Sequence, residues 1–415
     1  MTTELQKATQ KDALKPTYPY MPKDEWAARI AKARRLMAAR GLDALMILNN
    51  QDRLYFFGAS KTYRNVYADI GIIPLQGPTT AVLESGDALI VETEGYAEWC
   101  VGYRGDTQAP TATAPDPVAL LVEVLRELDL AGKTIGMEFG EFMWWDGLTM
   151  NEWERLKAAM PGTKFVDATA LIWEMRMVKS AWEQSVMRYL HHLTAKGYAK
   201  MVHDAAPGVN EKQLFNDALK MWIDEGIVDS ANYTLSCLNA IQPFRNRVLK
   251  DGDWIMLDGG PSYKGYCSDM QRFIRIGDPG PEFMRASALA SESMMAVEEI
   301  LKPGITAGQI WDVAYGKMAE KEPEIWRKAR SRRMVGWVGH GEGLNIHEPP
   351  YFVEGSTSEI RAGMVIAVEV PSYHGGTFAN MPEDTYIITP TGYEKLSIDL
   401  GPTDTSVRTA MPMRP

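Results

Sequence analysis

Five side chains with metal-binding chemistry are spread along the second half of the chain. One is the imidazole of His340, and the other four are the carboxylates of Asp258, Asp269, Glu369 and Glu383. An oxygen-rich set of this kind suits hard or borderline divalent cations such as Mn²⁺, Fe²⁺, Co²⁺ or Zn²⁺ in a two-metal site. A structural zinc site would use thiolates instead. The residue types therefore predict a centre that holds two divalent cations.

Three of the four carboxylates also have a structural explanation, which the sequence leaves open. Asp258 follows the apolar run Trp254–Leu257, and Asp269 follows a glycine-rich turn, so the two could be the polar ends of a hairpin. Glu369 interrupts the β-branched run Val365–Val370. A buried carboxylate without a partner costs several kcal/mol, so Glu369 requires an arginine, a metal or a proton.

The glycine-rich run "GHGEG" around His340 is not a phosphate-binding loop. It lacks the GxGxxG spacing at a strand-to-helix turn and the P-loop lysine, which excludes nucleotide binding. His340 stands out because it accompanies four carboxylates. The remaining histidines, apart from His347, are interpreted as ordinary polar residues: His191, His192, His203 and His374.

Composition narrows the class of protein. The chain has 415 residues, which favours two domains, and its net charge is −10. An acidic chain without a basic run argues against a nucleic-acid partner. No apolar stretch approaches the ~20 residues of a membrane span, and the polar N-terminus is unlike a secretory signal. Three widely spaced cysteines are typical of a reducing compartment, so we expect a cytoplasmic protein.

The first half of the chain alternates between helical and strand patterns. Residues 24–40 fit a helix stopped by Gly41, and residues 117–132 fit another. Strands are predicted at Leu42–Asn49, Asp87–Thr93 and Lys133–Phe139. Such alternation predicts an α/β domain with a largely parallel sheet.

A long helical stretch begins near Thr169, and the join between the two domains is predicted within it, near Met177–Ala181. We therefore expect an N-terminal domain at residues 1–178 and a catalytic domain at residues 179–415.

The second half contains a faint internal repeat. Pro207-Gly208 and Pro303-Gly304 each precede an apolar residue, a capping Asn or Thr, and an amphipathic helix. The repeat suggests two similar halves that face each other, with the site between them.

The order of the five candidate ligands resembles that of the pita-bread metallohydrolases, peptidase family M24. This family includes methionine aminopeptidase, aminopeptidase P, prolidase and creatinase. The N-terminal half resembles the creatinase and prolidase branch. The resemblance covers nearly the whole chain and rests on the segments "RMVKSAWEQSVMR", "LDGGPSYKGYCSDMQRF", "GHGEGLNIHEPP", "GMVIAVEVPSY" and "PEDTYIITPTGYEKL".

The resemblance implies a creatinase-like α/β domain followed by an α+β pita-bread domain with a pseudo-two-fold repeat. It also implies a homodimer, in which the N-terminal domain of one subunit helps to close the site of the other.

The resemblance further implies a role for each site residue. Asp258 would end a strand and bind one metal, Asp269 and Glu383 would bridge, and His340 and Glu369 would hold the second metal. A tight hairpin would bring Asp258 and Asp269 together. His347 would be catalytic, as a hydrogen-bond donor or proton shuttle beside the substrate.

Two departures from the peptidases bear on substrate choice. Phe244 stands where the peptidases carry a histidine, and Met381 where aminopeptidase P and prolidase carry an arginine. Arg245 and Arg247 are candidates to bind a substrate carboxylate, or are merely solvated charges. We therefore expect a two-metal hydrolase that cleaves a C–N amide bond in a small, carboxylate-bearing substrate, with weak activity on general peptides.

Two alternatives stay open. One is a plain Xaa-Pro dipeptidase or aminopeptidase. The other is a metal-dependent lyase similar to dimethylsulfoniopropionate lyase, although Gly260 and Ile346 stand where that enzyme carries aspartates. A non-catalytic binding module is disfavoured, because this chain keeps all five candidate ligands.

Overall fold

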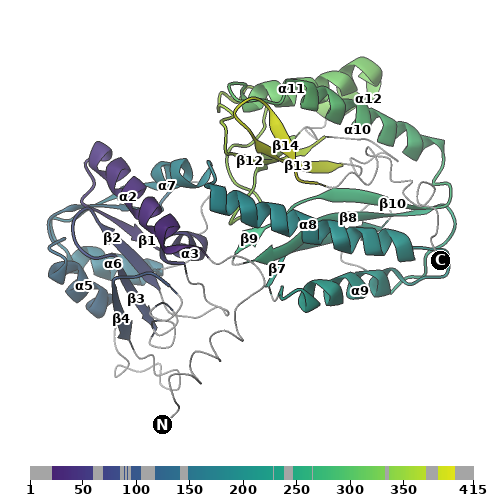
Figure 1. Ribbon diagram of the computed structural model, residues 1–415. Helices are drawn as coiled ribbons and strands as arrows, with labels where there is room; N and C mark the ends of the chain where they lie inside the picture. The colour runs from purple at the N-terminus through teal and green to yellow at the C-terminus, as the bar shows by residue number, and fades with distance from the viewer. Residues whose placement is uncertain are drawn as a thin grey trace, which may run out of the picture. The chain divides into compact units, whose positions relative to one another are not determined.

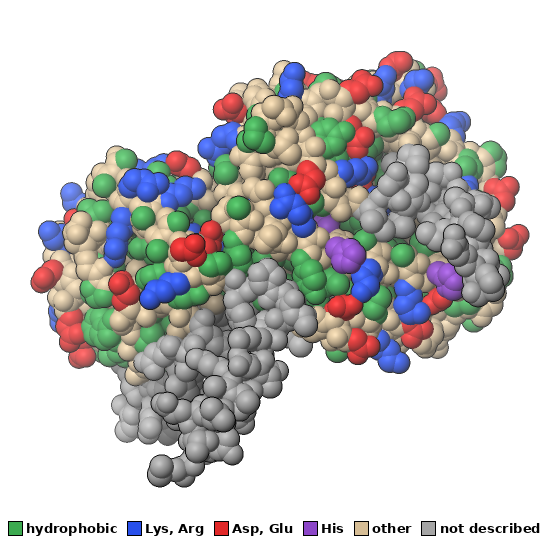
Figure 2. All heavy atoms as spheres, in the orientation of Figure 1, with side chains coloured by type: hydrophobic (Ala, Val, Ile, Leu, Met, Phe, Trp, Pro, Cys, Tyr) green, Lys and Arg blue, Asp and Glu red, His purple; other side chains and the backbone are tan. Residues whose placement is uncertain are grey.

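The computed structural model describes residues 21–58, 69–84, 88, 91, 95–103, 117–140, 148–227, 229–237, 246–263, 265–331, 336–370 and 382–397 (Figure 1). The chain forms two compact units, one spanning Met21–Arg176 and the other beginning at Met177. On the face drawn in Figure 2, acidic and basic side chains are interspersed over both units. No helix within the described residues has the length and hydropathy of a membrane span.

The N-terminal unit is built on a six-stranded sheet with the order β4-β3-β2-β1-β5-β6. Three of its five strand pairings are parallel, and β2 runs antiparallel to both of its neighbours. The strands are β1 (Ala44–Ile47), β2 (Ile70–Pro74), β3 (Thr80–Glu84), β4 (Trp99–Tyr103), β5 (Thr134–Met137) and β6 (Lys164–Asp167).

Helices surround this sheet. The predicted first helix is confirmed as α2, which ends at Gly41 in the left-handed conformation that glycine adopts most easily. Leu121 and Leu125 of α5 pack into the same core as the apolar strand residues. The helices of the unit are α2 (Lys23–Arg40), α3 (Asn50–Phe57), α5 (Pro117–Glu127), α6 (Met150–Ala159) and α7 (Thr169–Arg176).

The strand predicted at Asp87–Thr93 is wrong. The structure describes two residues of this segment, Ala88 and Val91, and both are helical and buried. Gly95 donates its backbone N–H to the carbonyl of Val91, as in a helical turn. Short apolar runs fit a buried strand and a buried helical turn equally well, which explains the error.

The C-terminal unit contains an eight-stranded antiparallel sheet. Its main path is β11-β12-β13-β10-β8-β7, with β14 paired to β13 and β9 paired to β8. The strands are β7 (Asp229–Cys237), β8 (Asp253–Tyr263), β9 (Tyr266–Cys267), β10 (Gln271–Ile276), β11 (Gly339–Gly341), β12 (Val365–Glu369), β13 (Glu383–Ile388) and β14 (Tyr393–Lys395).

Two groups of helices cover this sheet. In Figure 1, α8 and α9 run along β7, β8 and β10, whereas α10, α11 and α12 lie over β12, β13 and β14. A core cluster joins Trp311 and Met318 to Val368 and Tyr386, so α11 packs on β12 and β13. The helices are α8 (Ala181–Asp204), α9 (Glu211–Asp224), α10 (Pro281–Ile300), α11 (Ala307–Lys321) and α12 (Pro323–Ser331).

The internal repeat has matching contacts in its two copies. Gly208 donates its N–H to Leu249, and Gly304 donates its N–H to Ile360. The next helices, α9 and α11, begin at their predicted capping residues, Asn210 and Thr306, through side-chain caps. The two copies of the repeat therefore begin in the same way, as the sequence predicted.

Candidate metal centre

Strand register places three of the candidate carboxylates in one row across the sheet. Gln271 on β10 pairs with Asp258 on β8 and with Glu383 on β13. Glu383 in turn stands directly opposite Glu369 on β12. Four antiparallel strands therefore bring residues far apart in sequence to one place.

Asp258 does not end a strand, contrary to the sequence prediction. It lies in the middle of β8, which continues to Tyr263 and then turns back into β9. The glycines after Asp258 read as the start of a turn in the sequence, but β8 continues through them, paired with β7 at Gly259 and again at Pro261 with a shift of register between. The hairpin between the two aspartates is confirmed, and Asp269 follows it, two residues before β10 begins.

His340 faces the carboxylates. Its Nε2 lies 3.5 Å from Glu383 Oε1, 3.6 Å from Glu369 Oε1 and 3.9 Å from Asp269 Oδ2. Its Nδ1 lies 3.0 Å from the carbonyl oxygen of Gly341 and donates to it. Because that bond places the proton on Nδ1, the lone pair of Nε2 points to the carboxylates, as a metal ligand requires.

The donor atoms form overlapping groups. The sets Asp258–Asp269–Glu383, His340–Glu369–Glu383 and Asp269–His340–His347 each bring their ligand atoms within 4.8 Å of one another. Asp269, Glu369 and Glu383 each have a buried oxygen without a hydrogen-bond partner among the described residues. Unpartnered buried carboxylate oxygens that converge with an imidazole nitrogen fit a pair of divalent cations.

Burial and mutual repulsion disfavour the charged forms of these carboxylates. Burial is the largest cause, and it raises the pKa of Asp258 to about 7 and that of Glu369 to about 8. Burial and then the neighbouring carboxylates raise the pKa of Asp269 and Glu383 well above the usual range. The cluster therefore requires positive charge to be fully ionised near neutral pH.

His347 lies beside this cluster, and two aromatic rings lie close to it. Its ring centroid is 4.4 Å from that of His340 and 5.0 Å from that of Trp337. Trp337 stacks on Tyr351 with an interplanar angle of 5°. His347 is an exposed residue, yet desolvation by the protein around its ring, followed by the charge of His340, lowers its pKa to about 4.

Three of the four residues predicted to contact the substrate cannot be placed. Phe244, Arg245 and Met381 lie outside the described residues. Arg247 already has two carboxylate partners, with Nε 3.1 Å from Glu211 and Nη1 3.3 Å from Asp253.

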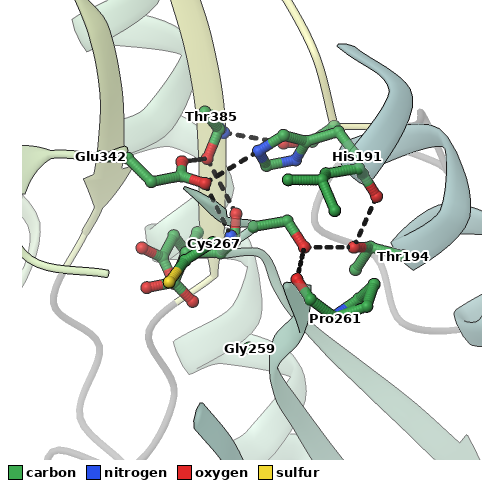
Figure 3. Close-up of polar contacts among 12 residues, drawn as sticks. His191, Thr194, Gly259, Pro261, Cys267, Glu342 and Thr385 are labelled. Carbon is green, nitrogen blue, oxygen red and sulfur yellow. Dashed lines mark hydrogen bonds and ion pairs between the residues drawn. The ribbon is translucent and has the colours of Figure 1, made fainter. Parts of the chain in front are cut away.

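Two buried residues beside the cluster were not singled out from sequence. Glu342 contacts the backbone of Asp269, and His191 on α8 contacts Glu342 (Figure 3). One signal was available for Glu342, because it follows His340 by two residues in an extended segment and so shares its face. His191 had no such signal, since α8 is far from the candidate ligands in sequence.

The fold and the donor set define a pita-bread metallohydrolase. Residues 185–390 match the sequence profile of Metallopeptidase family M24, and residues 29–178 match the Creatinase/Prolidase N-terminal domain. The chain belongs to metallopeptidase family M24, in the branch that carries this N-terminal domain, and is therefore a metal-dependent hydrolase.

Relatives and solved structures agree with this membership. The chain is 26% identical to a probable dipeptidase, PepE, of Mycobacterium tuberculosis, over 88% of this chain and 93% of that protein. An Xaa-Pro dipeptidase from Bacillus anthracis superimposes with a TM-score of 0.74 at 20% identity, covering 90% of this chain and 97% of the other. The zinc-substituted aminopeptidase P of E. coli gives 0.72 at 17% identity, covering 95% and 100%. The family and fold predicted from sequence are confirmed.

Proposed function

We propose that this protein is a two-metal hydrolase of the Xaa-Pro peptidase and creatinase type, which cleaves a C–N amide bond. The observation that carries the proposal is the convergence of the His340 Nε2 lone pair with the carboxylates of Asp269, Glu369 and Glu383, whose buried oxygens lack hydrogen-bond partners among the described residues. Relatives that carry peptidase names support an amide substrate.

The residues would divide between two cations, of which Mn²⁺, Fe²⁺, Co²⁺ and Zn²⁺ suit the donors. Asp258 would hold one cation, His340 and Glu369 would hold the other, and Asp269 and Glu383 would be shared. When bound, two such cations lower the pKa of a water and polarise a carbonyl group. The chain's own contribution is to fix the donors, through strand register and the Nδ1–H bond of His340.

His347 would handle protons beside the substrate. It is exposed and adjoins His340, so a substrate at the cluster can reach its ring. Trp337 holds the ring from a second side. These contacts support a role in donating a hydrogen bond or proton to the reacting amide. The ring also lies within reach of Asp269 and His340 as a ligand, and we propose that it acts on the substrate instead.

The substrate we propose is small, bears a carboxylate, and has an apolar or cationic body. Phe244 and Met381 support it, because the peptidases carry polar groups at these places. The stacked pair Trp337 and Tyr351, with Trp337 at 37% exposure, offers an aromatic face beside His347. Such a face binds apolar or cationic groups. Arg247 is a weaker candidate for the carboxylate contact, because Glu211 and Asp253 already engage its guanidinium.

The lyase alternative has less support. A Cβ at Gly260 would lie 2.3 Å from Ser268 Oγ and 2.6 Å from Thr194 Oγ1, so the additional aspartate of that enzyme has no room here. Hydrolysis yields an amine and an acid, whereas elimination yields an unsaturated acid, so the products distinguish the two.

We further propose a cytoplasmic homodimer, with residues 1–178 as the N-terminal domain and residues 179–415 as the catalytic domain. The molecular mass in solution scattering tests the dimer, and a monomer with full activity would refute it.

The function is tested with protein loaded separately with Mn²⁺, Co²⁺, Fe²⁺ and Zn²⁺. Each form is assayed against proline dipeptides and tripeptides, cyclic amides and betaine-like acids, with products identified by mass. We expect hydrolysis of a small acid and weak peptide cleavage. A peptide cleaved with kcat/KM above ~10⁴ M⁻¹s⁻¹ would make the chain an ordinary peptidase instead. An unsaturated product would make it a lyase.

A further inference from the structure

Glu342 is fully buried directly behind the candidate metal cluster. Its Oε1 accepts a hydrogen bond from the backbone N–H of Asp269 at 2.9 Å and lies 3.1 Å from Nε2 of His191. Its Oε2 lies 2.8 Å from the hydroxyl of Thr385, which also lies 2.8 Å from the carbonyl oxygen of Asp269. Figure 3 shows the carboxylate of Glu342 in contact with both His191 and Thr385.

These contacts hold both backbone polar groups of Asp269. This residue lies between β9 and β10, where the chain has left one strand and not yet entered the next. Its backbone N–H and carbonyl groups are therefore not fixed by pairing between strands. The side chains of Glu342 and Thr385 bind them instead. The direction of the Asp269 carboxylate depends on this backbone, and Asp269 belongs to two of the three candidate ligand groups.

One face of α8 supports the same segment on both sides of Asp269. His191, Thr194 and Tyr198 are spaced at i, i+3 and i+7, so they share a face of the helix. The hydroxyls of Thr194 and Ser268 are 2.6 Å apart. The Tyr198 hydroxyl lies 2.7 Å from the carbonyl oxygen of Met270 and 2.8 Å from that of Gly259.

Asp269 and its two neighbours in sequence are thus each linked to the same helix, α8, by side-chain contacts. Ser268 is held by Thr194, Asp269 is held by His191 through Glu342, and Met270 is held by Tyr198. Tyr198 also reaches Gly259, the neighbour of Asp258. A single helix face therefore controls the backbone at both candidate aspartate ligands.

We propose that the His191–Thr194–Tyr198 face of α8, acting through Glu342, positions Asp269 for metal binding. These are positioning residues, since none of them belongs to the candidate ligand groups. The inference rests on the two-metal function proposed above and adds a role for residues outside the ligand set. Partners of this kind typically change metal affinity by about 10- to 100-fold when they are lost.

The experiment measures the dissociation constants of Mn²⁺ and Co²⁺ in the full-length protein, together with the visible absorption of bound Co²⁺. His191→Phe keeps a buried ring but removes the nitrogen that contacts Glu342. His191→Gln keeps a donor in that place. His192→Phe is the matched control, because His192 is the next residue of α8 and is exposed.

We expect His191→Phe to bind metal ~10-fold more weakly or worse, with an altered Co²⁺ spectrum, and His191→Gln to recover most of the affinity. His192→Phe should bind like the wild type. Circular dichroism checks that each variant is folded. In a folded variant, a general loss of stability would not change the Co²⁺ spectrum, and it would not explain why His191→Gln recovers metal affinity.

Tyr198→Phe removes a single oxygen atom and decides the question if His191→Phe does not fold. We expect it to weaken metal binding at least ~3-fold, because the carbonyl oxygens of Gly259 and Met270 lose the one hydroxyl proton that they share. If the wild type binds two metals and the folded variants bind them with the same affinity, the positioning role of α8 is overturned, and the proposed function stands. A wild type that takes up no metal would overturn the proposed function, and this inference with it.

Discussion

Glu369 and Glu383 stand directly opposite each other on the antiparallel strands β12 and β13. Like charges in this position destabilise a sheet, and both side chains are largely buried. Within the described part of the chain, neither has an ion pair with arginine or lysine, so the arginine alternative for Glu369 finds no support there. Divalent cations bound by both side chains, as proposed above, would offset this repulsion.

His347→Ala should keep its metal and lose turnover. His347 adjoins His340 but lies at the exposed side of the cluster. We expect kcat to fall by ~10²- to 10⁴-fold, as for the loss of a general acid. Metal content by mass spectrometry and steady-state kinetics check this together, and loss of metal along with activity would make His347 a ligand.

Trp337→Ala should raise KM for substrates with an apolar or cationic body. The indole is 37% exposed and stacks on Tyr351 beside His347, so it is available to a bound molecule. A cation–π contact of ~0.5–2 kcal/mol corresponds to a KM increase of about 2- to 30-fold. The variant should keep its metal, and an unchanged KM for every substrate found would remove Trp337 from the binding site.

Gly260→Ala should destabilise the protein. The added Cβ would lie 2.3 Å from Ser268 Oγ and 2.6 Å from Thr194 Oγ1. Overpacking of this kind costs ~1–3 kcal/mol in the free energy of unfolding, measured by denaturant titration. Gly316→Ala in α11 is the control, because nothing lies within 4 Å of its Cβ position. It should stabilise the helix by ~0.5–1 kcal/mol, and equal effects of the two changes would contradict the close packing at Gly260.

Lys179→Met should be strongly destabilising. Lys179 and Glu348 form a buried ion pair at 3.0 Å, and Glu348 also accepts the N–H of Asn345 in the loop that carries His347. Loss of one partner of a buried pair costs ~3–5 kcal/mol. Lys196→Met, which breaks the exposed pair with Glu225, should cost less than ~1 kcal/mol. If both variants lose a similar free energy of unfolding, the buried pair contributes no more to stability than the exposed pair.

Much of this fold followed from local signals in the sequence. The capping residues Asn210 and Thr306 and the terminal Gly41 marked helix ends because their preferences depend on a few neighbouring atoms. Asp87–Thr93 was misread because a run of seven residues carries too little periodicity to separate strand from helix.

The sequence predicted which residues supply the metal-binding atoms, but it did not predict the strand pairings and buried contacts around them. Residue type alone suggested the metal chemistry of His340 and the carboxylates. Asp258 lies within β8 because it pairs with Thr234 on β7 and with Gln271 on β10, and no local pattern encodes these pairings. The contact between His191 and Glu342 joins residues 151 positions apart, so only the folded chain reveals it.

The two-metal site is tested by the metal content of the purified wild type and of Asp269→Ala. Both proteins are saturated with Mn²⁺, freed of excess metal by gel filtration and analysed by mass spectrometry. His192→Phe serves as a control for handling. We expect about two equivalents in the wild type and loss of most of them in Asp269→Ala, because Asp269 belongs to two ligand groups. Two equivalents retained in Asp269→Ala, or none in the wild type, would contradict this expectation.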